Sequence, residues 1–166
     1  MSYSKPVKVA LLNLSASYLQ ALYLSPIKTK SLTSCAIASL GNYTSQKISG
    51  AKEINCDSLL AFGLFGLLFG GTVPHYFYHT LEWIVPGSNK TASLLKLFIE
   101  RFIYAPFYQY FALYVLSRLE GKSHLTAKKL LQNVYFDVLR ANWKWLSIVQ
   151  FINLFFIPPV VKKILY

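Results

Sequence analysis

The chain has 166 residues, of which 54% are hydrophobic and 14% charged, and its mean hydropathy is +0.39. Soluble domains average about 25% charged residues, so this composition is untypical of a soluble domain. It also excludes a disordered chain, which needs low hydrophobicity and high charge density. Four membrane helices of roughly 20 residues each, with their connections, account for nearly the whole length. We therefore expect one integral membrane domain, residues 1–166, without a separate catalytic domain.

The chain is strongly basic, with 17 Lys and Arg against 6 Asp and Glu and a net charge of +11. A nucleic-acid-binding protein gathers such charges on one hydrophilic face. Here the charges come in pairs between apolar stretches, as in Lys28 and Lys30 or Lys128 and Lys129. This pattern is typical of the flanks of membrane helices and predicts the lipid bilayer, and no nucleic acid, as the partner.

Residues 7–24 predict an amphipathic helix at the membrane surface. Asn13, Ser17 and Gln20 form a polar stripe at i, i+4 and i+7, and most other positions are apolar. Lysines before an apolar run also occur in signal peptides, but the polar residues inside this run and the lack of a small-residue cleavage site disfavour that reading. Pro26 ends the helix, because proline disfavours helical geometry in the residue before it.

The rest of the chain predicts an all-α polytopic membrane bundle of about four transmembrane helices. We place these helices at residues 31–47, 58–84, 92–117 and 145–161. Residues 118–144 are interpreted as a polar loop between the last two helices. The helix at 58–84 is the most apolar, and Pro74 is expected to kink it. Its small residues allow another helix to approach closely, and the helix-packing candidates are Gly63, Gly66, Gly70 and Gly71.

Polar side chains interrupt these apolar helices. Glu100 and Arg101 are the most costly, since a charge at that depth costs about 2.5–3.5 kcal/mol on insertion scales. Adjacent side chains point about 100° apart on a helix, so we expect each to find a partner elsewhere and not in the other. Our leading hypothesis is a shared polar interior that lines a pore; in the alternative, these groups only bond neighbouring helices. The pore-lining candidates are Ser39, Asn42, Gln46, His75, Glu100, Arg101, Gln109, Gln150 and Asn153.

The chain carries no convincing catalytic or cofactor motif. His75 and His79 are spaced like zinc-binding histidines, with Glu82 one turn further on, but Tyr76 occupies the place of the glutamate in HExxH. The sequence has neither the GxSxG nucleophile elbow nor a GxxxxGK[ST] phosphate loop. We therefore expect no enzymatic activity, no cofactor and no metal site. The two histidines are expected to line a polar cavity or to bond carbonyls near the Pro74 kink.

Several blocks of residues resemble the peroxisomal membrane protein 2 family, whose members are small four-helix proteins of peroxisomes and of the mitochondrial inner membrane. The similarity runs from about residue 18 to residue 163, and its most specific part is the C-terminal block. In chain order, the blocks are residues 18–24 with Pro26 and Thr29-Lys30, Gly41-Asn42, Gly66 and Gly71 with His75 and Tyr78, Glu100-Arg101 with Ala105-Pro106, residues 119–122, and Asn142-Trp143 with Gln150, Asn153 and Pro158.

The resemblance implies a passive, weakly selective channel for small water-soluble metabolites in the peroxisomal membrane, formed by a multi-pass protein that assembles as a homo-oligomer. Two alternatives stay open: a relative of the same family in the mitochondrial inner membrane, and a non-conducting membrane scaffold or assembly protein. The chain departs from the family at several positions, among them Thr72, Trp145, which lies one place early, and Ile148, which replaces a usual proline. Thr72 follows Gly71 where the family has proline, and family members continue beyond residue 166, so we expect a shortened C-terminus that affects the last membrane crossing.

Overall fold

The computed structural model describes residues 5–87 and 89–156, and the side chains of residues 9–10, 12–87 and 89–145. Helices are the only regular secondary structure in the described ranges, which confirms the all-α class. In chain order, the elements are α1 (Lys5–Leu24), α2 (Pro26–Ile48), α3 (Cys56–Phe65), the π-helical η1 (Gly66–Gly70), α4 (Thr72–Ile84), α5 (Lys90–Ile99), the π-helical η2 (Glu100–Tyr104), α6 (Ala105–Leu119) and α7 (His124–Phe156).

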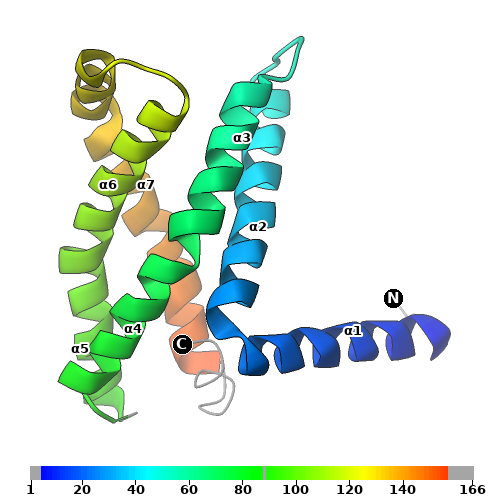
Figure 1. Ribbon diagram of the computed structural model, residues 1–166. Helices are drawn as coiled ribbons and strands as arrows, with labels where there is room; N and C mark the ends of the chain where they lie inside the picture. Colours follow the sequence, from blue (N-terminus) through cyan, green and yellow to red (C-terminus); the bar gives the residue numbers. More distant parts are fainter. Residues whose placement is uncertain (1–4, 88, 157–166) are drawn as a thin grey trace.

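The long helical stretches stand side by side as a bundle, and α1 projects sideways from one end of it (Figure 1). α2 packs against α3, η1 and α4, while α6 packs against α7, and contacts between α3 and α6 join the two pairs. The α2–α3 and α6–α7 turns lie at the end of the bundle remote from α1, and the α4–α5 connection lies at the same end as α1 (Figure 1). The described part of the chain is therefore an up-and-down bundle with a lateral N-terminal helix.

The corner between α1 and α2 is built by local hydrogen bonds. The Thr29 hydroxyl lies 2.9 Å from the carbonyl oxygens of both Ala21 and Ser25, and so ties the first turn of α2 to the end of α1. Leu22 is buried at this corner, whereas Leu12 and Leu14 further out on α1 are about two-thirds exposed, at 67% and 70%. Most of α1 thus lies outside the bundle, as a helix at a membrane surface would.

The interpretation of residues 118–144 as a polar loop is wrong, because α7 begins at His124 and covers most of this segment. Ala127, Leu131 and Leu139 are buried at helical spacing, on a helix that packs against α6. The high charge of the segment hid this periodicity, since the charged residues occupy the remaining, exposed positions. Only residues 120–123 separate α6 from α7, and Gly121, at a φ of 78°, allows the chain to leave α6.

Both middle stretches of the bundle contain a π-helical turn followed closely by a proline. Pro74 lies four residues after the end of η1, and Pro106 lies two residues after the end of η2. Proline lacks the N–H that would bond the carbonyl four residues earlier, and its ring crowds that carbonyl. A change in hydrogen-bond spacing just ahead of each proline accommodates this defect. The change of direction between α3 and α4 in Figure 1 lies at this position.

The closest contact between helices is made where α2 crosses the glycines of α3 and η1. A Cβ atom added at Gly66 would lie 2.6 Å from the backbone oxygen of Ser34, and one added at Gly71 would lie 2.4 Å from the backbone nitrogen of Ser31. At Gly63 the obstacle would be the Ser39 hydroxyl, at 2.8 Å, and at Gly70 it would be the Ser34 side chain. Only glycine therefore permits this backbone separation.

The outside of the bundle is rich in large apolar side chains, whereas many of its buried residues are small. Trp83 and Phe107 are 80% and 75% exposed, while Ala61, Ala112 and Ala127 are buried. Among the described residues, one helical stretch, Cys56–Ile84, is long and apolar enough to cross a membrane by length and composition, with a mean hydropathy of 1.6 over 18 residues. Small residues inside and large apolar residues outside are typical of helices that pack in lipid.

The glycine contact predicts a clear contrast between two substitutions. Gly66→Ala should destabilise the bundle by about 1–3 kcal/mol, the usual cost of overpacking, because the new methyl group meets backbone atoms of α2. Gly41→Ala is the matched control, because a Cβ atom there meets nothing within 4 Å and alanine favours a helix over glycine by about 1 kcal/mol. Thermal unfolding of both variants in the same detergent measures the difference. Equal stability of the two variants would show that α2 does not pack on this glycine.

Candidate functional site

The structure distributes the candidate pore-lining residues over separate places. Asn42 and Gln46 lie at the end of α2 remote from α1, Glu100, Arg101 and Gln109 lie between η2, α6 and α7, and His75 lies in a cleft beside α1. Ser39 faces Gly63 at the contact of α2 with α3. Gln150 and Asn153 fall in α7 beyond the residues whose side chains are described.

The first group ties α2 to the start of α3. The Gln46 side chain accepts a hydrogen bond from the backbone N–H of Asn55 at 2.7 Å and donates to the Asn55 carbonyl at 3.2 Å. Its amide nitrogen also donates to Asn42 Oδ1 at 2.7 Å, and Asn42 Nδ2 donates to the Ser58 hydroxyl at 3.0 Å. Asn55 in turn caps α3 by accepting from the backbone N–H of Ser58.

Glu120 extends this network to the α6–α7 turn. The Ser58 hydroxyl donates to Glu120 Oε1 at 2.7 Å, and Lys122 Nζ lies 2.6 Å from Glu120 Oε2. Burial raises the pKa of the Glu120 carboxyl, but hydrogen bonds from Lys122 and Ser58 and the charge of Lys122 outweigh burial, so that its pKa lies below the ordinary value for a glutamate. The carboxylate therefore connects the two turns at this end of the bundle. The sequence singled out Glu120 only as part of the family resemblance.

Glu100 and Arg101 form an ion pair, with 3.6 Å between Arg101 Nη2 and Glu100 Oε1 and side chains only about a tenth exposed, at 10% and 8%. The expectation that these adjacent residues do not pair with each other is therefore wrong, although Arg101 also has a partner elsewhere, Asn142 on α7, as expected. Their Cα–Cβ directions diverge, but both side chains are long and flexible enough to bend toward each other. Leaving either charge uncompensated in this apolar interior costs more than bending the side chains.

Arg101 also holds α7 against the bundle. Its Nη1 lies 3.4 Å from Asn142 Oδ1, and Asn142 Nδ2 donates to Gln109 Oε1 at 3.2 Å. The Trp143 indole donates to the Arg101 carbonyl at 3.1 Å. The sequence-based candidate set lacks both Asn142 and Trp143, because they fall in the segment interpreted as a loop. Their place in the C-terminal block of the family resemblance was the available signal.

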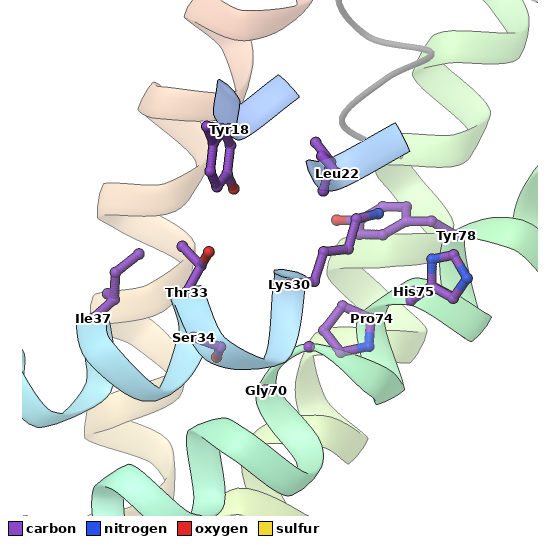
Figure 2. A pocket seen from close by; sticks show the side chains of 11 residues that line it. Tyr18, Leu22, Lys30, Thr33, Ser34, Ile37, Gly70, Pro74, His75 and Tyr78 are labelled. Atoms are coloured by element: carbon purple, nitrogen blue, oxygen red, sulfur yellow. The ribbon is translucent and has the colours of Figure 1, made fainter. Parts of the chain in front are cut away.

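His75 lines an open cleft of about 300 Å³ at the corner between α1 and the bundle. Figure 2 shows Tyr18 and Leu22 on one side of the cleft, with Lys30 extended toward Tyr78 and His75 on α4. The His75 Nδ1 atom is buried without a hydrogen-bond partner among the described residues. The cleft is separate from both polar networks, and most of the surface of its walls is apolar.

The geometry does not support the alternative of a metal site at His75, His79 and Glu82. Glu82 forms an ion pair with Lys96 on α5. Within residues 5–87 and 89–156, no group of three or more His, Cys, Asp or Glu side chains converges in a way that would hold a metal ion.

Comparison with known proteins identifies relatives over nearly the whole chain. Residues 117–163 match the Mpv17 / PMP22 family. The chain is 31% identical over 150 residues to peroxisomal membrane protein 2 of Bos taurus, an alignment that covers 86% of this chain and 76% of the relative. It is 32% identical over 166 residues to PXMP2/4 family protein 3 of Dictyostelium discoideum, covering 98% and 87% respectively.

A mitochondrial relative is also similar. Identity with the mitochondrial inner membrane protein Mpv17 of Homo sapiens is 28% over 145 residues, covering 86% of this chain and 82% of the relative. The names of these relatives describe membrane proteins and not enzymes. No solved structure gives a significant match.

The Glu120 network predicts a specific pH dependence of stability. Because the folded-state pKa is lowered, the carboxylate stabilises the fold above its unfolded-state pKa of about 4.3, and this stabilisation is lost as the pH falls through the folded-state pKa. Glu120→Gln should therefore lower stability at pH 7 and make it less dependent on pH between about pH 6 and pH 3. Thermal unfolding in detergent, followed by circular dichroism across this range, measures both effects.

Glu53→Gln is the matched control, since Glu53 is an exposed carboxylate in the neighbouring α2–α3 turn. It should leave the pH profile close to that of the unaltered protein. A Glu120→Gln profile as steep as that of the unaltered protein would contradict a stabilising role for this carboxylate.

Proposed function

Because the chain belongs to the Mpv17/PMP22 family of organelle membrane proteins, we propose that it forms a passive, weakly selective channel for small water-soluble metabolites, in the peroxisomal membrane. In this proposal, α2, the α3–α4 stretch, the α5–α6 stretch and α7 cross the bilayer, and α1 lies at its surface. The exposed Trp and Phe side chains of the bundle then face lipid.

The observation that carries the proposal is the buried ion pair of Glu100 and Arg101, with the amides of Gln109 and Asn142 beside it. Ionisable groups inside a membrane are costly, and proteins keep them where they serve ion or solute passage. No energy-coupling motif accompanies them in the sequence, which favours facilitated passage over pumping. Glu100, Arg101 and Gln109 therefore remain our candidates for the polar groups that set the selectivity of the passage.

A single copy offers little open space for such a passage. The polar side chains of the bundle are largely bonded to each other, and the described open cleft of about 300 Å³ lies at its end beside α1. We therefore propose that several copies assemble as a homo-oligomer, with the passage between or along their bundles.

The names of this chain's relatives refer to peroxisomes in some cases and to mitochondria in others, and the peroxisomal location is proposed from the first group. Peroxisomal membrane proteins of Bos taurus and Arabidopsis thaliana are similar to this chain, and so are mitochondrial inner membrane proteins. Imaging a tagged chain with markers for both organelles decides between them. Exclusive overlap with the mitochondrial marker would overturn the peroxisomal assignment while leaving the family unchanged.

Planar bilayer recordings test the channel itself. The purified protein should conduct ions, and Glu100→Gln should shift its selectivity toward anions, because it removes the negative charge that balances Arg101. Gln109→Glu adds a carboxylate to the same cluster and should shift selectivity the other way. The ratio of chloride to potassium permeability, from the reversal potential in a KCl gradient, measures both shifts.

Folding and assembly must be followed alongside conductance, because Glu100→Gln leaves Arg101 without its carboxylate partner. Circular dichroism and size-exclusion chromatography in detergent provide this control. A folded, assembled and electrically silent protein would contradict the channel and favour the non-conducting scaffold. The amides of Asn42 and Gln46, which bond each other and the start of α3, are the observation that favours that second role.

A further inference from the structure

The outer face of α7 carries a line of hydrophilic side chains, here named the α7 stripe. Their spacing of three or four residues places them on one face of the helix. All are exposed, and the buried Ala127, Leu131 and Leu139 occupy the roughly opposite face. The α7 stripe consists of Lys129, Asn133, Asp137, Arg140 and Lys144.

Contacts with α6 fix the depth of this stripe. The Tyr135 hydroxyl donates to the Pro106 carbonyl at 3.3 Å, and Asn142 bonds Gln109 at 3.2 Å. Nearer the turn, the Tyr114 hydroxyl lies 3.0 Å from His124 Nδ1. Residues 124–143 of α7 therefore run beside residues 101–114, which lie within the third proposed membrane span. The α7 stripe lies at the same depth.

Such a stripe cannot face hydrocarbon. From Lys129 to Lys144 it extends about 22 Å at a rise of about 1.5 Å per residue, against a hydrocarbon thickness of about 30 Å. Side chains near its two ends could reach the membrane surface, but Asp137 and Arg140 lie near its centre. These two residues pair with each other, with 3.8 Å between Arg140 Nη1 and Asp137 Oδ1, yet their side chains remain 79% and 78% exposed. Charged groups at this depth need water or a protein partner.

We propose that the α7 stripe lines a water-filled passage between copies of this chain, and that the passage favours small anions. This inference rests on the proposed channel function, and it places the passage on the outer face of α7, with the Glu100–Arg101 pair behind that helix. A second copy supplies the opposite wall, so the passage is incomplete in one chain. The α7 stripe holds three basic residues and one acidic residue, and this excess of positive charge attracts anions such as small carboxylates.

Lys129 and Lys128 offer a matched pair for the charge test. They are neighbours at one depth on α7, both exposed, but about 100° apart around the helix, and only Lys129 belongs to the α7 stripe. Lys129→Gln should lower the chloride-to-potassium permeability ratio by roughly two- to fivefold, the effect of one charge at contact distance in water. Lys128→Gln should leave the ratio unchanged. Equal effects of the two substitutions would overturn the proposed orientation of α7.

Cysteine labelling tests for water in the passage without a current. In a background with Cys35→Ser and Cys56→Ser, Asn133→Cys should react in liposomes with a small charged methanethiosulfonate reagent. Phe107→Cys is the control at similar depth, since Phe107 is 75% exposed on α6, and it should react only with a lipophilic maleimide. Asn133→Cys that resists the charged reagent would overturn the proposal, including the case in which two stripes pack together in a dry contact.

The outcomes separate this inference from the channel itself. If the protein conducts, but Lys129→Gln leaves its selectivity unchanged and the Asn133→Cys variant is not labelled, the channel is supported and the role of the α7 stripe is contradicted. If the protein does not conduct, but the Asn133→Cys variant reacts with the charged reagent, the channel is contradicted. The α7 stripe is then hydrated but does not line a passage.

Discussion

The close approach of α2 to η1 is the contact on which the arrangement of the first half of the chain depends. At Gly66 and Gly71 the two backbones are so near that a single methyl group would collide with main-chain atoms of α2. The contact lies in the first half of α2 and near the middle of the Cys56–Ile84 stretch, and it sets the relative position of their ends. At one end it brings Gln46 beside the start of α3, and at the other it places the corner of α1 and α2 beside α4, where the cleft lies.

A second constraint comes from the surroundings of the bundle. Side chains at the depth of lipid have no water to bond, so every polar group there needs a protein partner or an aqueous surface. The inner polar groups meet this demand within the chain: Asn42 and Gln46 bond the start of α3, and Arg101, which pairs with Glu100, and Gln109 both bond Asn142 on α7. On the outer face of α7, Asp137 and Arg140 pair with each other but stay largely exposed, and this difference in exposure between the faces of α7 motivates an aqueous passage there.

Much of this fold follows from the sequence. Helical periodicity and prolines located the first three proposed spans and the N-terminal helix to within a few residues, because a long apolar stretch has few alternatives to a helix in lipid. α7 was missed because its charges were weighed above the helical spacing of Ala127, Leu131 and Leu139. The Glu100–Arg101 pair was missed because backbone direction alone does not determine where long side chains end. The first error could be corrected from the helical spacing alone, whereas the second required the side-chain positions.

The rotation of α7 about its own axis links the inner and outer polar surfaces. The Trp143 indole on the Arg101 carbonyl, Asn142 on Gln109, and the Tyr135 hydroxyl on the Pro106 carbonyl hold α7 at three points along its inner face. A rotation by one residue, about 100°, would break all three bonds. It would also turn Arg140 and Asp137 away from the outer face that they now share. The Arg101 guanidinium, which bonds Asn142, thus helps to fix which side chains α7 presents at the α7 stripe.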